Sequence, residues 1–270
     1  MSYTAWVFTI GTELVQGRVV NTNAAYIGRR LTLLGFNVIG VITLVDDVET
    51  VSRYLSNVLI HERPRVVVTT GGLGPTYDDR TLEAVAKALS RRLVLNEEAF
   101  KTVKEKYDKK GLPLTPERVK MAYLPEGAEP IPNPVGTAPG SWIEHGNTII
   151  VSLPGVPSEM MSMWEGWVEP RLKSIGPRLH IAEITIKIVG VPEASLAPFI
   201  EKAVKKFARV YIKSHPKGEE LGKPVVELYI MASDESSEKA ISIAEDVAKF
   251  IVDSLHPYPA SVERLETRVS

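Results

Sequence analysis

Residues 66–81 read VVVTTGGLGPTYDDRT, and this stretch decides the fold class of the first 175 residues. Its opening run of five β-branched residues is typical of a buried central strand. Three glycines separate this run from an apolar stripe at helical spacing, formed by Leu82, Val85, Ala86 and Leu89. A strand that passes through a glycine-rich turn into a helix indicates one βα unit of a parallel sheet.

The same alternation continues on both sides of this stretch. Residues 6–10 and 38–44 are predicted strands, and helical periods follow them at residues 24–34 and 48–59. Further helices are predicted at 97–110 and from Pro116, and the segments 141–144 and 148–153 predict a hairpin. We therefore expect an α/β fold, with a mostly parallel sheet covered by helices on both faces.

The composition changes near residues 174–177, which predicts two domains, 1–175 and 176–270. Beyond this point Ile184, Ile186 and Ile188 alternate with polar residues, as in a half-exposed strand. The predicted order β-α-β-β-α describes a small α+β domain with helices on one face of a sheet.

Composition excludes several classes of protein. Without cysteine, the chain has no disulfides, thiolate nucleophile or zinc-thiolate site. The balance of 32 Lys+Arg against 33 Asp+Glu argues against a general nucleic-acid binder. No signal peptide or apolar run long enough to span a bilayer is apparent, so the sequence predicts a cytoplasmic protein without a membrane partner.

The glycine-rich segment 70–81 is the strongest candidate for a binding site. Glycines between a buried strand and a helix expose backbone N–H groups suited to phosphate or another anion. The spacing matches neither the P-loop nor the dinucleotide fingerprint. Asp78 and Asp79 would oppose a bare anion, which favours a bridging cation. The alternative is that one of these two aspartates caps the following helix.

Four other segments are expected at the same edge of the sheet. In residues 11–17, Glu13 is a cation ligand, a hydrogen-bond acceptor or simply solvated. Asn23, in the Asn-Thr-Asn segment that follows, is expected to cap the next helix rather than to contact the ligand. The pair Asp46-Asp47 adds carboxylates, or caps the next helix. Residues 136–140 and 153–159 combine Pro with Gly in rigid turns, which bind the ligand or are ordinary turns.

Several of these motifs together resemble a known family. They are Gly-Thr-Glu-Leu (11–14), Asn-Thr-Asn (21–23), Asp46-Asp47, Thr-Gly-Gly-Leu-Gly-Pro-Thr-x-Asp-Asp (70–79), Leu-Pro-Glu-Gly-Ala (124–128), Asn-Pro-Val-Gly-Thr-Ala-Pro-Gly (133–140) and Leu-Pro-Gly-Val-Pro-Ser-Glu-Met (153–160). Across residues 3–165 the sequence resembles the N-terminal portion of CinA, the competence/damage-inducible protein. That portion is a MoaB/MogA-like molybdopterin-binding domain.

Residues 177–257 resemble the KH-type domain that follows in CinA. A KH domain that binds RNA needs a Gly-x-x-Gly loop, whereas residues 218–222 read GEELG, with the wrong spacing and two acids. Binding of nucleic acid is therefore not expected. Full-length bacterial CinA also carries a C-terminal nicotinamide mononucleotide deamidase domain. The sequence ends where that domain would begin, so deamidase activity is not predicted.

The resemblance implies a divalent-metal-dependent ADP-ribose pyrophosphatase that yields AMP and ribose 5-phosphate. Under this hypothesis Asp78, Asp79 and Glu13 are catalytic, and Glu13, Asp47, Asp78 and Asp79 hold a cation such as Mg²⁺, which activates water. The residues expected to bind phosphate or nucleotide are Gly11, Thr12, Thr70, Gly71, Gly72, Gly74, Thr81, Gly136, Thr137, Pro154, Gly155 and Ser158.

The resemblance also supports an alternative, a molybdopterin-binding or adenylyl-transferring protein of molybdenum-cofactor biosynthesis. In either case the partner is a small nucleotide or pterin phosphate, and a homo-oligomer is expected by analogy. A third reading is an assembly or nucleic-acid module built on the second domain. The five histidines lie outside the motifs, so exposed or structural roles are expected for them.

Overall fold

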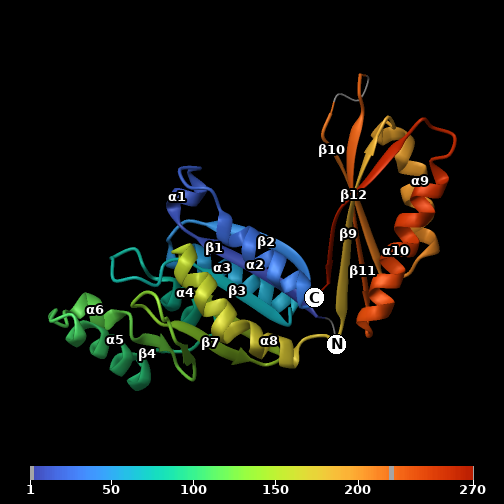
Figure 1. Cartoon of the computed structure of the whole chain (residues 1–270). Coiled ribbons are helices and arrows are strands. Elements are labelled where there is room, and N and C mark those ends of the chain that lie inside the picture. Colours follow the sequence, from blue (N-terminus) through green and yellow to red (C-terminus); the bar gives the residue numbers. More distant parts are fainter. Residues whose placement is uncertain (1–2, 219–221, 270) are drawn as a thin grey trace. The chain divides into compact units, whose positions relative to one another are not determined.

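The structure, a computed structural model of the chain, describes residues 3–218 and 222–269 (Figure 1). It divides into two compact units. The first contains residues 1–32 and 36–176, and the second contains residues 33–35 and 177–270.

A six-stranded sheet forms the centre of the first unit. Its strands are β1 (Thr4–Ile10), β2 (Asn37–Leu44), β3 (Val66–Thr70), β6 (Glu129–Ile131), β7 (Gly140–His145) and β8 (Thr148–Leu153). Their order is β2-β1-β3-β8-β7-β6. Strands β2, β1, β3 and β8 run parallel, and β7 pairs antiparallel with both β8 and β6. The predicted α/β class, mostly parallel sheet and hairpin are confirmed.

Helices cover both faces of this sheet (Figure 1). They are α1 (Thr12–Val15), α2 (Thr22–Leu33), α3 (Val48–Asn57), α4 (Thr81–Ala88), α5 (Glu97–Lys109), α6 (Pro116–Lys120), α7 (Pro157–Met163) and α8 (Glu169–Ile175). Within the described part of the chain, no helix is long and apolar enough to cross a membrane.

Side chains that alternate along the strands pack into two apolar layers, one on each face of the sheet. Phe8, Val67 and Ile150 are fully buried in a core that includes side chains of α3 and α4. Their neighbours along the strands point to the opposite face, because successive side chains of a strand alternate. Asn23 of α2 donates a hydrogen bond to the Thr70 hydroxyl on that second face. Burial on both faces explains why β3 is a continuous β-branched run.

Several local features depart from the sequence-based expectations. The helix predicted to end at residue 59 changes at Asn57 into a π-helical turn, Val58–Glu62. A second π-helical turn, Trp164–Val168, joins α7 to α8. The short strands β4 (Leu93–Leu95) and β5 (Tyr123–Pro125) form a separate two-stranded sheet that the sequence did not predict.

The second unit is a four-stranded antiparallel sheet with two helices. Its elements are β9 (His180–Val189), α9 (Glu193–Lys206), β10 (Val210–Pro216), β11 (Val225–Asp234), α10 (Ser237–Ser254) and β12 (Ser261–Val269). The sheet order is β10-β11-β9-β12. The exposed strand β12 was not predicted, because its apolar residues do not alternate regularly. The resulting β-α-β-β-α-β order is a split β-α-β arrangement.

The prediction of a KH-type domain is not confirmed by this topology. Of its GEELG segment, residues 219–221 lie outside the described residues.

The buried face of the first sheet gives a test of the packing. We expect Ile150→Ala to lower the free energy of unfolding by about 2–5 kcal/mol, because Ile150 has no exposed surface. The control is Ile60→Ala, the same change at a side chain that is 61% exposed, with an expected effect within about 0.5 kcal/mol. Denaturant unfolding measures both, and equal costs would contradict this packing.

Candidate functional site

A cavity of about 480 Å³ opens at the carboxyl edge of the parallel strands. The segments that follow β1, β2, β3 and β8 all contribute to its lining, with Glu13, Asp46, Gly71–Thr76 and Pro154–Val156. Ligands of open α/β sheets bind at this edge, because the loops after adjacent parallel strands converge there. The volume lies in the range of small-molecule sites, roughly 300–1,000 Å³.

The turn after β3 has a backbone that only glycine permits. Gly71 has φ +105°, and a Cβ atom there would lie 2.0 Å from the carbonyl oxygen of Ile10. Gly72 has φ +66°, and its Cβ would lie 2.3 Å from Thr81 Oγ1. Gly155 approaches from the next loop, with its ideal Cβ 3.3 Å from Gly71 Cα. The absence of side chains thus lets three loops meet around one cavity.

This turn presents free backbone donors. The Gly71 amide continues the sheet ladder and donates to Leu153 O at 3.0 Å. Within the described residues, the next three amides, those of Gly72, Leu73 and Gly74, donate to no protein acceptor. Thr81 Oγ1 is also buried without a partner there. Neighbouring amides without acceptors form a site suited to an oxygen anion.

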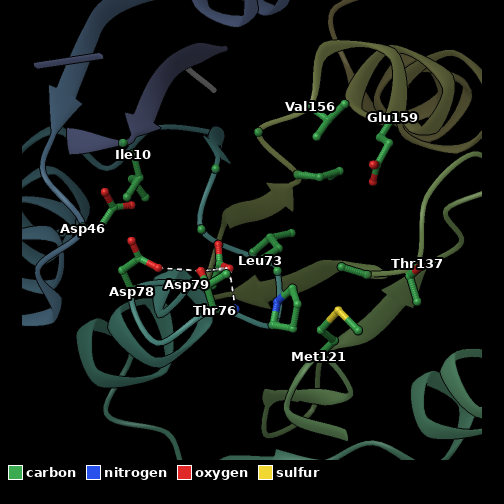
Figure 2. A pocket seen from close by; sticks show the side chains of 18 of the residues that line it. Ile10, Asp46, Leu73, Thr76, Asp78, Asp79, Met121, Thr137, Val156 and Glu159 are labelled. Atoms are coloured by element: carbon green, nitrogen blue, oxygen red, sulfur yellow. Dashed lines mark hydrogen bonds between the residues drawn. The ribbon is translucent and has the colours of Figure 1, made fainter. Parts of the chain in front are cut away.

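Asp78 and Asp79 line the cavity beside this turn and are both held by Thr76 (Figure 2). The Thr76 hydroxyl lies 2.5 Å from Asp78 Oδ1 and from Asp79 Oδ2, and the Thr76 amide donates to Asp79 Oδ2 at 2.9 Å. The Thr76 hydroxyl, followed by a backbone N–H, holds the pKa of Asp78 below its ordinary value. The alternative that one of them caps α4 is wrong, since Arg80 occupies that position.

The two carboxylates that follow β2, those of Asp46 and Asp47, have different roles. Asp46 lines the cavity, and its Oδ2 accepts hydrogen bonds from the Thr12 amide at 2.7 Å and the Thr12 hydroxyl at 3.0 Å. Asp47 caps α3, where Thr50 donates to its carboxylate and holds the pKa of Asp47 below its ordinary value. Asp47 is not among the residues that line the large cavity.

The predicted cation site does not assemble in the described residues. No group of three or more His, Asp or Glu side chains is placed there to hold a metal ion. Glu13, Asp78 and Asp79 share the cavity, but Thr76 occupies oxygens of the two aspartates. Asp47 caps α3 outside the cavity lining, so the set Glu13, Asp47, Asp78 and Asp79 does not fit a divalent cation.

Glu159 of α7 lies on the other side of the cavity from Asp78 (Figure 2). Its Oε2 accepts a hydrogen bond from Nδ2 of the buried Asn133 at 2.7 Å. The Lys106 ammonium group donates hydrogen bonds to the carbonyl oxygens of Asn133 and Gly136. Burial lowers the pKa of Lys106, against the opposing effect of the Glu159 charge.

The structure brings most, but not all, of the predicted site residues together. Those that line the cavity are Gly11, Glu13, Gly71, Gly72, Gly74, Asp78, Asp79, Thr137, Pro154 and Gly155. Those outside its lining are Thr12, Asp47, Thr70, Thr81, Gly136 and Ser158. Thr12 and Thr70 hold neighbouring groups, since Thr12 binds Asp46 and Thr70 donates to Pro154 O.

The expected cap of α2 also needs correction. The Asn21 side chain accepts the hydrogen bond of the Ala24 amide, as a cap does. Asn23 instead is buried and donates to Thr70 Oγ1 and to the carbonyl oxygen of Gly155. It therefore joins the loops after β3 and β8.

Sequence reasoning missed several side chains around the cavity. Asp46 was expected only as one of a pair that adds carboxylates or caps a helix, and Glu159 stood in a quoted motif without an assigned role. Tyr107 and Met121 come from α5 and the end of α6, helical segments that lie outside the glycine-rich motifs. Lys120 donates to the carbonyl oxygen of Thr76, and burial lowers the pKa of Lys120. For Asn133 the sequence offered one signal, its position in front of Pro134 in a quoted motif.

Comparison with known proteins assigns the first unit to a family. Residues 6–174 match the family model described as "Probable molybdopterin binding domain". A protein of Aeropyrum pernix is 52% identical over 236 residues, covering 87% of each chain. A protein of Pyrobaculum arsenaticum is 46% identical over 257 residues, covering 95% of this chain and 96% of that chain.

Among solved structures, the protein CinA of Thermoplasma acidophilum is similar to this chain. The identity is 41% and the TM-score 0.59, covering 63% of this chain and 98% of that chain. That protein is described as having unknown function. The predicted molybdopterin-binding domain is thus confirmed, with a CinA protein as a structural neighbour. The KH-type domain, the lack of a deamidase domain and the homo-oligomer stay predictions.

The family match corrects the main functional hypothesis. The prediction of a metal-dependent ADP-ribose pyrophosphatase is wrong, because the model that spans residues 6–174 describes binding of molybdopterin. The alternative, a molybdopterin protein of molybdenum-cofactor biosynthesis, agrees with this match. The error arose because the activity was carried over from the family resemblance, and a shared fold does not by itself identify the ligand.

The close approach at Gly71 gives a test of the turn. We expect Gly71→Ala to destabilise the first unit well beyond the roughly 1–2 kcal/mol of a left-handed alanine, because its Cβ would meet Ile10 O. Gly146→Ala is the matched control, since Gly146 has φ +59° and open space around it. Denaturant unfolding compares the two, and equal costs would refute the steric argument.

The effect of the Thr76 hydroxyl on the pKa of Asp78 can be tested by varying the pH. Thr76→Val removes the hydroxyl, so the pKa of Asp78 is expected to rise toward its ordinary value. Because the pKa of Asp78 is lower in the folded than in the unfolded state, its carboxylate stabilises the fold at pH values above the unfolded-state pKa, about 3.9. This stabilisation is lost as the pH falls through the folded-state pKa. The stability difference between the proteins should therefore shrink at low pH.

Carboxyl NMR titration measures this shift directly. The pKa of Asp47, which depends on Thr50, should stay unchanged in the same spectra. An unchanged pKa at Asp78 would show that Thr76 does not set it.

Proposed function

The chain belongs to the molybdopterin-binding domain family, and from this we propose that the cavity of its first unit binds molybdopterin in molybdenum-cofactor biosynthesis. The observation that carries the proposal is that Gly72, Leu73 and Gly74 line the cavity while their amides lack acceptors among the described residues. Molybdopterin ends in a phosphate, and consecutive backbone N–H groups bind phosphate oxygens without a basic side chain.

The remaining lining suits the rest of this ligand. Leu73, Met121 and Val156 supply apolar surface for a flat heterocycle. Carboxylates that line the cavity supply acceptors for the N–H groups of a pterin ring. A cavity with a few placed polar groups on apolar walls is the usual form of a small-molecule site.

The turn residue Gly72 gives the direct test of this function. We expect Gly72→Ala to weaken molybdopterin binding about tenfold or more, because its Cβ would meet Thr81 Oγ1 and displace the amides. The matched control is Gly17→Ala, which also has positive φ, +70°, but nothing within 4 Å. Titration followed by fluorescence or calorimetry gives the dissociation constants, and inorganic phosphate should compete with molybdopterin.

Two results would count against the proposal. One is that the wild-type protein does not bind molybdopterin at all. The other is that Gly72→Ala and Gly17→Ala bind it equally well, which would place the phosphate elsewhere.

A further inference from the structure

Glu159 is the carboxylate of the cavity that is most firmly oriented by buried groups. Asn133, which is 2% exposed, donates from Nδ2 both to Glu159 Oε2 at 2.7 Å and to Ala138 O at 2.9 Å. Its Oδ1 accepts from the amides of Val135 at 3.2 Å and Gly136 at 2.8 Å. The Asn133 amide is thus fixed at both ends, and it fixes the Glu159 carboxylate in turn.

The backbone of the turn at Gly136 also restricts this carboxylate, and a lysine holds that turn. A Cβ at Gly136 would lie 1.9 Å from Glu159 Oε2, so the backbone of this turn closes over the carboxylate. Lys106 holds the same turn through its carbonyl oxygens rather than through Glu159. Across the described residues, no Lys or Arg forms an ion pair with Glu159, although the charge of the nearby Lys106 acts on it, so the carboxylate can still accept hydrogen bonds from a ligand.

Four other carboxylates line the cavity, and three of them accept hydrogen bonds from threonines, whereas Glu13, in the loop after β1, accepts none within the described residues. Asp78 and Asp79 are bonded to Thr76 next to the turn that would hold phosphate, and Asp46 is bonded to Thr12. Glu159 lies apart from them on the opposite wall (Figure 2). A ligand anchored by its phosphate at Gly72–Gly74 would therefore extend its other end toward Glu159.

We infer that Glu159 recognises the pterin ring through its two adjacent donors, the N3–H and the 2-amino group. This inference rests on the proposed function. A carboxylate accepts two parallel N–H bonds from such a cyclic guanidine edge, as it does from arginine. A ring with oxygen in place of the 2-amino group would put an acceptor against the carboxylate and be rejected, because buried polar groups would be left unpaired.

The substitution Glu159→Gln should change this preference in a defined way. Asn133 donates to position 159, so it fixes the glutamine with its carbonyl oxygen toward Asn133 and its NH₂ group toward the cavity. An NH₂ group there opposes the 2-amino group of pterin. It complements the 2-oxo group of lumazine, the pteridine in which oxygen replaces that amino group.

The experiment measures dissociation constants of pterin, lumazine and molybdopterin by fluorescence titration. Wild type is expected to bind pterin about tenfold or more tightly than lumazine. Glu159→Gln should lose pterin and molybdopterin affinity by a similar factor and lose or reverse the preference. The matched control is Glu144→Gln, an exposed glutamate outside the cavity lining, which should retain both affinities.

The outcomes separate this inference from the proposed function. Unchanged molybdopterin and pterin affinity in a folded Glu159→Gln protein overturns the role of Glu159 while leaving molybdopterin binding in place. A wild type that binds molybdopterin but does not prefer pterin to lumazine also overturns it. A wild type that binds none of the three overturns the proposed function itself. Thermal unfolding of the variant shows whether it is folded.

Discussion

The cavity depends on one steric constraint, the contact between the turn after β3 and the end of β1. Gly71 lies so close to the carbonyl oxygen of Ile10 that no side chain fits between them. Gly155 closes the opposite side of the same turn. Because both contacts are between backbones, the loops keep fixed positions, and the amides of Gly72, Leu73 and Gly74 are left without acceptors among the described residues. The binding site is thus a consequence of backbone packing, which side chains then refine.

Charge is distributed unevenly around this cavity. Its lining carries several carboxylates, while the nearby Lys106 and Lys120 turn their ammonium groups to carbonyl oxygens. A bare phosphate would be attracted by the turn amides and repelled by Asp78 and Asp79. The arrangement therefore favours a ligand with an anionic end and a heterocycle rich in N–H donors. A pterin phosphate has both properties, which joins the geometry to the family assignment.

Sequence patterns predicted the fold of the first unit well, because strands buried on both faces and glycine-rich turns leave strong local signals. They failed where tertiary partners decide. Asn23 stands where a helix cap is expected, but its side chain joins two loops, and Asn21 takes the cap. The exposed strand β12 has no buried face to impose alternation, so its pairing with β9 was not predicted.

The sequence alone determined the α/β class, the glycine turn and the group of loops that would meet, since these follow from periodicity and from backbone conformations that need glycine. Which carboxylate faces the ligand was decided only by tertiary structure. Asp46 and Asp47 are adjacent in sequence, yet one lines the cavity and the other caps a helix. Glu159 gains its orientation from Asn133, which is distant in sequence. Side-chain roles depend on such long-range contacts, which local sequence patterns do not predict.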